Sequence, residues 1–140
     1  MTDTFDKKTR SYIMSMIKGK DTKPEIIVRK FLFGRGFRYG LHNSKLTGKP
    51  DIVLRKYKTV VFVNGCFWHG HEGCKYFVIP KTRTEWWRDK INRNIERDKK
   101  SIEELERLGW KVLTVWECEL KKDKREETLM RLVNLIDKEK

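Results

Sequence analysis

The sequence lacks the patterns that divide a chain into several domains or insert it into a membrane. Its 140 residues contain no Ser/Gly-rich linker, no internal repeat and no low-complexity tract, so a single domain over residues 1–140 is expected. No run of roughly 18 apolar residues occurs, and no membrane span is predicted. The polar opening MTDTFDKKTR has no apolar signal-peptide region, which predicts a cytoplasmic protein.

Cysteine is scarce, and acidic residues are outnumbered by basic ones. Three cysteines is an odd number, and a disulfide framework is not expected in a reducing cytosol, which leaves metal binding or burial. The formal net charge is +13, with a pI of about 9.8, and such an excess attracts polyanions. Nucleic acid is favoured over an anionic membrane because the sequence has no basic helix with a strongly apolar opposite face.

Hydrophobic periodicity predicts the element order ααββαβα. The second helix is capped by Asp21 or Thr22, and Gly34 and Gly36 close it. The other elements are helices over 6–18, 82–108 and 126–140, and strands over 51–55, 58–63 and 110–118. A tight hairpin is expected at residues 56–57, and the long helix could cross over between two strands. This order predicts a small mixed α/β sheet with helices on its faces.

The segment VNGCFWHGHEGC, residues 63–74, contains candidate metal ligands. Cys66, His71 and Cys74 have the spacing C-x4-H-x2-C, and Cys118 lies at the end of the last predicted strand. Together they form a Cys3His set, which is usual for a structural zinc ion. Two alternatives remain open at this stage: one or two of the cysteines are simply buried, or His69 takes the place of His71.

Asp51 is the candidate ligand of a catalytic metal. The pair Pro50-Asp51 opens a strand, as in restriction-endonuclease-like nucleases, where the Asp holds Mg2+ against the scissile phosphate. The E-x-K motif that usually follows is missing from the next strand. By itself the pair is also typical of a turn that caps a strand. His69 is a candidate base, since a neutral imidazole near a metal-bound phosphate could deprotonate water.

Aromatic and basic residues are interleaved in two segments. This pattern suits nucleic-acid binding, because rings stack on bases while cations bind phosphates. Core packing is the alternative role, and we expect it for one residue of the adjacent pair Trp86 and Trp87. The candidate DNA-binding residues are Phe67, Trp68, Trp87, Lys49, Arg83 and Arg88.

Several motifs together resemble the very short patch repair (Vsr) endonucleases. They are GKPDIV, VVFVNGCFWHGHEGC, TRTEWWRDKINRNIERD and LGWKVLTVWEC. The resemblance runs from about residue 6 to about residue 135 and also covers DKKTRSYIMSMI and KDTKPE. It implies a restriction-endonuclease-like fold and a Mg2+-dependent enzyme that recognises T:G mismatches left by 5-methylcytosine deamination. Such an enzyme nicks the strand 5′ of the mismatched thymine.

The resemblance also implies specific roles. Asp51 and the main-chain carbonyl of Val63 hold Mg2+, His69 is the general base, and Glu25 and Asp98 support them. Four residues bind structural zinc: Cys66, His71, Cys74 and Cys118. An aromatic wedge enters beside the mismatch: Phe67, Trp68 and Trp87. An N-terminal helical arm of about residues 1–19 contacts DNA from the opposite groove.

The sequence departs from the family at Asn64, where a second catalytic histidine is common, and in the spacer from His71 to Cys74, which is one residue longer. Asn cannot transfer a proton at neutral pH, but it can donate a hydrogen bond to a phosphate. Two alternative functions are therefore kept: a restriction or homing endonuclease that cuts matched duplex, and a zinc-stapled DNA-binding module without catalysis.

The resemblance implies partners besides mismatched double-stranded DNA. They are a companion cytosine-5 DNA methyltransferase in the same cell and a mismatch-repair matchmaker protein. On DNA, the enzyme would be associated with the nucleoid. A monomer is expected because an asymmetric lesion needs no two-fold symmetric protein.

Overall fold

The computed structural model describes residues 22–43 and 45–137. The helix predicted over 6–18, and the arm of about residues 1–19, lie outside the described residues. Within the described ranges, no helix is long and apolar enough to span a membrane.

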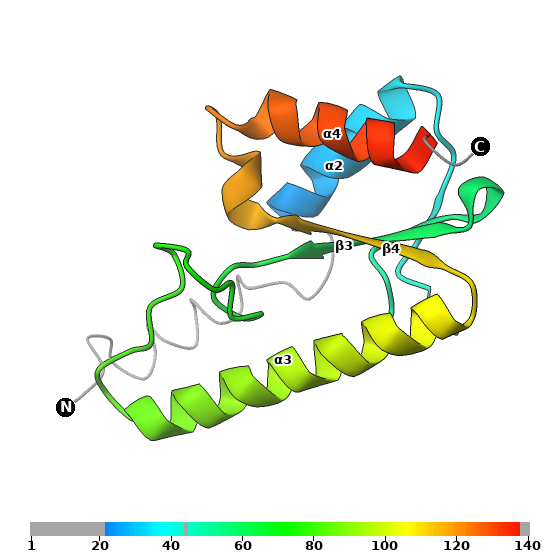
Figure 1. Cartoon of the computed structure of the whole chain (residues 1–140). Helices are drawn as coiled ribbons and strands as arrows, with labels where there is room; N and C mark the ends of the chain where they lie inside the picture. Colours follow the sequence, from blue (N-terminus) through cyan, green and yellow to red (C-terminus); the bar gives the residue numbers. More distant parts are fainter. Residues whose placement is uncertain (1–21, 44, 138–140) are drawn as a thin grey trace.

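A mixed sheet lies at the centre of the described chain (Figure 1). Its spatial order is β1-β2-β3-β4, with antiparallel pairing at β1/β2 and β2/β3 and parallel pairing at β3/β4. The strands are β1 (Gly40–Leu41), β2 (Ile52–Leu54), β3 (Thr59–Asn64) and β4 (Lys111–Trp116). The long helix α3 (Thr84–Arg107) joins the parallel pair, as predicted for a crossover between them.

Helices cover both faces of the sheet. The helices α2 (Lys23–Gly34) and α4 (Arg125–Asp137) lie on one face, and α3 lies on the other (Figure 1). Ile52 and Leu54 belong to the larger core under α2 and α4, whereas Val53 belongs to a smaller core with Leu105 of α3. Because both faces are buried, the strands read as continuous apolar runs rather than as alternating patterns.

The element boundaries differ from the predicted ones at two turns. The connection after β2 is not a two-residue hairpin, because Arg55–Tyr57 form a 3-10 turn (η1) and Lys58 adopts a left-handed φ of 51°. The predicted hairpin is present, since β2 and β3 pair antiparallel with Leu54 opposite Thr59, but its connection at residues 56–57 was predicted too short. β4 stops at Trp116, since Glu117–Leu120 form a second 3-10 turn (η2). Cys118 consequently lies on a turn rather than in the strand.

The predicted ends of two helices are confirmed. Thr22 is the N-cap of α2, and its Oγ1 accepts a hydrogen bond from the Glu25 N–H at 3.4 Å. Gly109 follows α3 with a φ of +95°, a conformation that favours glycine. β1 was not predicted, because two residues are too few to show a period.

Candidate active site and metal centre

Asp51 is fixed at the point where the chain enters β2. Its Oδ2 accepts a hydrogen bond of 2.7 Å from the Val63 N–H of the neighbouring strand, and the side chain is 15% exposed. Burial raises the pKa of Asp51 from 3.8 to about 6, against the lowering effect of that hydrogen bond, and the negative charge of Glu25 raises it further. The nearby His42 and His69 lower the pKa of Asp51, but by less than burial raises it. The carboxylate therefore lies in an environment that a cation would stabilise.

Glu25 and His42 join Asp51 in one cluster. Glu25, in the first turn of α2, is 2% exposed, and its Oε2 lies 3.0 Å from Arg29 Nη2 and 3.2 Å from His42 Nε2. One ligand atom from each of Glu25, His42 and Asp51 lies within 4.8 Å of the others, so the three could hold a metal ion. Sequence reasoning missed His42, which lies outside every motif. Its one signal was being one of just three histidines in the chain.

His69 is paired with Asp98 of α3. Their Nδ1 and Oδ2 atoms are 2.6 Å apart. The turn that carries His69 is also held by Asn94 of α3, which donates a 2.9 Å hydrogen bond to the carbonyl of Trp68. Gly70 lies so close to α3 that a Cβ built on it would be 2.6 Å from Ile95 Cδ1. Helix α3 therefore sets the position of the imidazole.

The predicted Cys3His ligands are brought together. One ligand atom each of Cys66, His71, Cys74 and Cys118 lies within 4.8 Å of the others. His71 Nδ1 is 3.4 Å from Cys118 Sγ, and the Cys118 N–H donates to Cys66 Sγ at 3.3 Å. These separations suit one small ion bound by all four, since tetrahedral zinc places its ligand atoms about 3.5–3.8 Å apart.

The geometry also separates the two histidines of this segment. The ring of His71 stacks on Trp116 at 4.0 Å between centroids and 4° between planes, whereas His69 faces Asp98. Burial raises the pKa of the Cys66 thiol to about 12. A thiolate at this position therefore needs a bound cation. The residues fit a metal, with His71 rather than His69 as the nitrogen ligand.

The predicted wedge residues form one aromatic cluster. The ring centroid of Phe67 lies 5.2 Å from that of Trp68 and 5.4 Å from that of Trp87, and the two tryptophans are 5.8 Å apart. Trp86, 43% exposed, contacts Trp87 at 4.8 Å and lies under the guanidinium of Arg83. The loop after β3 and the start of α3 thus contribute to the same cluster.

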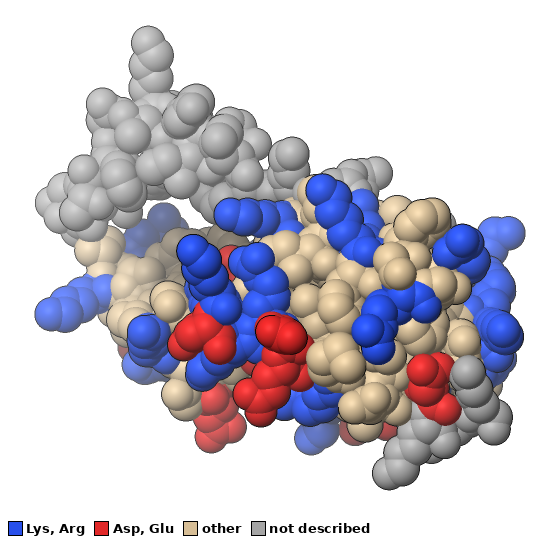
Figure 2. Space-filling model, turned by 90° about the horizontal axis from the view of Figure 1, so that it is seen from above, with Lys and Arg blue, Asp and Glu red and all other residues tan. Residues whose placement is uncertain are grey.

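The basic residues are spread over the surface. Lys49, Arg83 and Arg88, the predicted phosphate-binding residues, are all exposed. On the face shown in Figure 2, Lys and Arg side chains lie around much of the periphery, with acidic side chains gathered in fewer places. The net charge of +13 is therefore not confined to one stripe.

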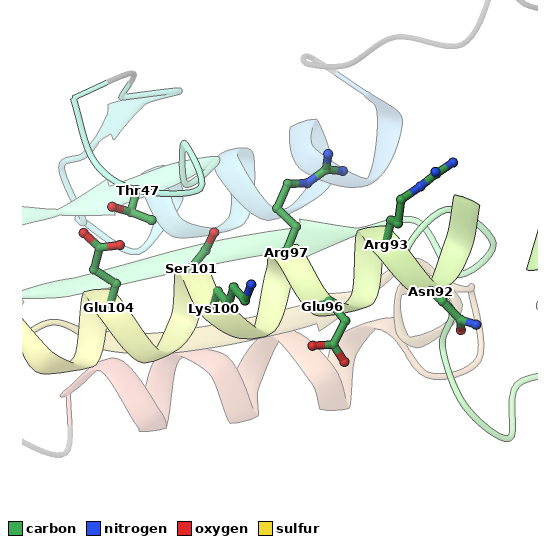
Figure 3. Close-up of a pocket in the computed structure, with 8 residues that line it drawn as sticks. All are labelled: Thr47, Asn92, Arg93, Glu96, Arg97, Lys100, Ser101 and Glu104. Carbon is green, nitrogen blue, oxygen red and sulfur yellow. The ribbon is translucent and has the colours of Figure 1, made fainter. Parts of the chain in front are cut away.

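A further surface of mixed charge lies along α3, with Arg93, Arg97 and Lys100 beside Glu96 and Glu104. A pocket of about 510 Å³ lies between this helix and the loop before β2, where Thr47 comes near Ser101 (Figure 3). Arg93 and Arg97 point to the same side of the helix in this view. Arg97 Nη2 also donates to Asn94 Oδ1 at 2.7 Å, so the pocket is linked to the residue that holds the Trp68 turn. Sequence reasoning did not select this surface.

Comparison with known proteins identifies the family. The model of the family "DNA mismatch endonuclease Vsr" matches residues 2–75. The chain belongs to this family. The type II nicking enzyme V.NmeAIP of Neisseria meningitidis serogroup A is 56% identical over 137 residues, 97% of each chain. The DNA mismatch endonuclease Vsr of Escherichia coli K12 is 46% identical over 121 residues, which cover 86% of this chain and 77% of the relative.

A third relative extends the same pattern. The type II nicking enzyme V.XorIIP of Xanthomonas oryzae is 44% identical over 120 residues, 86% of this chain and 88% of the relative. This Vsr family member is a DNA-nicking endonuclease with a restriction-endonuclease-like fold. The predicted family and fold class are confirmed.

Proposed function

We propose that this endonuclease recognises T:G mismatches arising from 5-methylcytosine deamination and nicks the strand 5′ of the mismatched thymine in a Mg2+-dependent reaction. The observation that carries the proposal is the meeting of three features at one end of β3. These are the buried carboxylate of Asp51, the His69–Asp98 pair and the aromatic cluster. A metal ligand, a proton acceptor and a stacking surface are what a nick beside a weak base pair requires.

Asp51 and the main-chain carbonyl of Val63 would hold Mg2+. Both offer oxygen, the ligand type that this hard ion prefers, and a bound cation would offset the burial that raises the pKa of Asp51. When bound, Mg2+ polarises the scissile phosphate and lowers the pKa of a coordinated water. Glu25 would lie next to the Asp51 carboxylate and help to orient the side chains around the ion.

His69 would accept the proton of the attacking water. The carboxylate of Asp98 can only accept a hydrogen bond, so across the 2.6 Å contact the ring proton would lie on Nδ1. Nε2 then carries the lone pair that receives the proton, and Asp98 stabilises the imidazolium that forms. Asn64 cannot take up a proton at neutral pH and would instead donate a hydrogen bond to the phosphate. His69 would therefore be the proton acceptor.

The aromatic cluster would recognise the lesion. A T:G wobble pair stacks less well than a matched pair, so prying its step open costs less than the few kcal/mol of an ordinary step. Phe67, Trp68 and Trp87 present rings that can fill the opened step. Lys49, Arg83 and Arg88 would bind phosphates on either side and hold the register without reading sequence.

The Cys3His cluster would hold structural zinc. Four protein ligands complete a tetrahedral site and leave no position open for catalysis. Zinc would fasten the loop that carries the wedge and His69 to the turn after β4. Fixing that loop serves the reaction, because a misplacement of about 1 Å can cost about 100-fold in rate.

The partners follow from the proposed lesion. A cytosine-5 DNA methyltransferase in the same cell would produce the methylated bases whose deamination gives T:G. A mismatch-repair matchmaker protein would act with the nicking enzyme at the lesion. We propose a monomer, because the mismatch has no two-fold symmetry.

Strand-specific nicking of labelled duplexes tests the proposal. The duplexes carry T:G, U:G, T:A or C:G at one position in several methyltransferase sequence contexts, with Mg2+ or with EDTA. We expect a Mg2+-dependent nick 5′ of the thymine in T:G alone, lost in Asp51→Ala with DNA binding retained. Cleavage of matched duplex would instead favour a restriction or homing enzyme, and binding with no cleavage in any duplex would favour a non-catalytic module.

A further inference from the structure

His42 lies beside the carboxylate proposed to hold the catalytic metal. It follows β1, and its N–H donates a 3.2 Å hydrogen bond to the main-chain carbonyl of Asp51. This bond continues the pairing of β1 with β2, in which Leu41 faces Ile52. The backbone position of His42 is therefore fixed to the residue that it neighbours.

The conformation of His42 is unusual for a residue with a side chain. Its φ is +45°, in the left-handed region, where non-glycine residues carry a cost of about 1 kcal/mol. The surrounding sheet pairing offsets this cost. The left-handed turn directs the imidazole toward Glu25 and Asp51, so that Nε2 is 3.2 Å from Glu25 Oε2 and Nδ1 is 3.8 Å from Asp51 Oδ1.

Glu25 and Arg29 both lie beside Nε2 of His42. Arg29 Nη2 is 3.0 Å from Glu25 Oε2 and 3.1 Å from His42 Nε2. Because a guanidinium can only donate, Nε2 accepts from Arg29 when the ring proton lies on Nδ1. When Nδ1 binds an ion, the ring proton moves to Nε2, where Glu25 Oε2 at 3.2 Å can accept it, and Arg29 keeps its bond to Glu25.

This arrangement matches the usual surroundings of a metal-bound histidine. Such a histidine binds the ion through one ring nitrogen and donates the other N–H to a carboxylate, which fixes the ring and raises its basicity. Here Glu25 is that carboxylate. Asp51 uses Oδ2 to accept the Val63 N–H, and Oδ1 is the oxygen that lies 3.8 Å from His42 Nδ1.

We propose that His42 Nδ1 is a further ligand of the divalent ion held by Asp51, and that this nitrogen gives the site a preference for Mn2+ that an all-oxygen site lacks. The inference rests on the proposed function, in which Asp51 binds the catalytic ion. Two atoms that each lie about 2.1 Å from one ion are at most about 4.2 Å apart. The 3.8 Å separation between Nδ1 and Oδ1 lies within that limit.

The metal preference follows from ligand chemistry. Mg2+ favours oxygen and keeps much of its water, whereas Mn2+, although it also suits oxygen ligands, belongs to the first-row series of ions that bind nitrogen more readily than Mg2+ does. A nitrogen ligand therefore adds more to the affinity for Mn2+ than to the affinity for Mg2+. It also gives bound Mn2+ a magnetic coupling to ¹⁴N that oxygen ligands cannot supply, and this provides a readout independent of nicking.

The experiment uses the full chain loaded with zinc, so that the cysteine cluster is filled before Mn2+ is added. Mn2+ binding is followed by electron paramagnetic resonance, and ¹⁴N coupling by pulsed spectroscopy of the bound ion. The main variant is His42→Asn, because Asn tolerates a left-handed φ, and His42→Gln is the second. His69→Gln is the matched control, since it removes the other imidazole near Asp51. Unfolding curves confirm that each variant is folded.

We expect ¹⁴N coupling in the unaltered protein and in His69→Gln, but not in the two His42 variants. We also expect Mn2+ affinity to fall about tenfold or more in the His42 variants and Mg2+ affinity, measured by competition, to fall less than about threefold. Retained ¹⁴N coupling in the His42 variants, or Mn2+ bound to the unaltered protein without such coupling, would overturn the role of His42 alone. If the zinc-loaded protein binds no Mn2+, or if Asp51→Asn binds Mn2+ as tightly as the unaltered protein does, the proposed catalytic metal site is overturned as well.

Discussion

His69 and Asp98 are joined by a contact of 2.6 Å between Nδ1 and Oδ2, although 29 positions separate them in the chain. The contact links the loop after β3 to the middle of α3. Both side chains are about one-third exposed, at 31% and 30%, so water and a phosphate can reach the imidazole. This exposure is what the proposed role of His69 as proton acceptor requires.

Asp98→Asn is expected to lower kcat about 10- to 100-fold while KM changes little. The amide carries no charge to stabilise the imidazolium, and its NH2 group can favour the wrong tautomer of His69. Single-turnover nicking of a T:G duplex measures the effect. Asp89→Asn, an equal change of charge at an exposed position of the same helix, is the control and should retain full activity. Equal rates in both variants would remove Asp98 from the mechanism.

Asp51→Asn is expected to abolish nicking and to stabilise the fold at neutral pH. In the folded state burial raises the pKa of Asp51 from 3.8 to about 6. Keeping the carboxyl ionised therefore costs stability above about pH 6, and this cost disappears as the pH falls toward 3.8. The amide oxygen can still accept the Val63 N–H. We expect the variant to gain about 1–3 kcal/mol in the free energy of unfolding at pH 8.

Urea unfolding of Asp51→Asn and of the unaltered protein, in buffer without added Mg2+ at pH 8 and at pH 5, measures this change in the free energy of unfolding. The gain should be largest at pH 8 and smaller at pH 5, where the folded carboxyl is already mostly protonated. Asp123→Asn, at an exposed position, is the control for loss of one negative charge. A gain that is the same at both pH values would show that burial of the Asp51 charge is not its cause.

The motif-bearing parts of the site could be predicted from the sequence, because their residues are close in the chain or have a characteristic spacing. Spacing indicated the Cys3His set but left His69 open in place of His71, which the family resemblance favoured, and the structure gathers His71 and the three cysteines within 4.8 Å. The wedge residues Phe67, Trp68 and Trp87 were also selected in advance and form one cluster. The helices followed from period and caps, since α3 buries one stripe of side chains against the sheet.

Parts of the site that depend on pairing and turns could not be predicted. His42 reaches Asp51 because β1 pairs with β2 and the next residue turns left-handed, and neither a two-residue strand nor a positive φ at His has a sequence signature. The hairpin between β2 and β3 was predicted, but its connection was predicted two residues too short, because Lys58, a residue that rarely adopts a positive φ, supplies the reversal. The pocket beside α3 needs Thr47 and Ser101 from distant segments.

Cys118→Ser is expected to lower the zinc content from about one ion per chain and to destabilise the fold by at least about 2 kcal/mol, because binding free energy at a structural zinc site is folding free energy. Metal analysis gives the content, and thermal unfolding gives the stability. Substitution by Co2+ should produce the absorption of a tetrahedral thiolate site. Glu117→Gln, on the same turn, is the control and should keep the metal. Full zinc occupancy in Cys118→Ser would exclude Cys118 as a ligand.

Gly70→Ala is expected to destabilise the protein more than Gly36→Ala, although both glycines have a positive φ, at 60° and 92°. Any side chain at such a φ costs about 1 kcal/mol. At Gly70 the new Cβ would also lie 2.6 Å from Ile95 Cδ1 and 2.9 Å from Ile91 Cγ2, whereas at Gly36 it would meet nothing within 4 Å. Overpacking of this kind adds about 1–3 kcal/mol.

The comparison isolates the close approach of the His69 turn to α3. Urea unfolding of zinc-loaded protein should place Gly36→Ala about 1 kcal/mol below the unaltered chain and Gly70→Ala about 2–4 kcal/mol below it. Nicking should fall in Gly70→Ala alone, because moving the turn away from α3 lengthens the contact between His69 and Asp98. If the two variants lose equal stability and both nick normally, the packing of this turn on α3 does not position the imidazole.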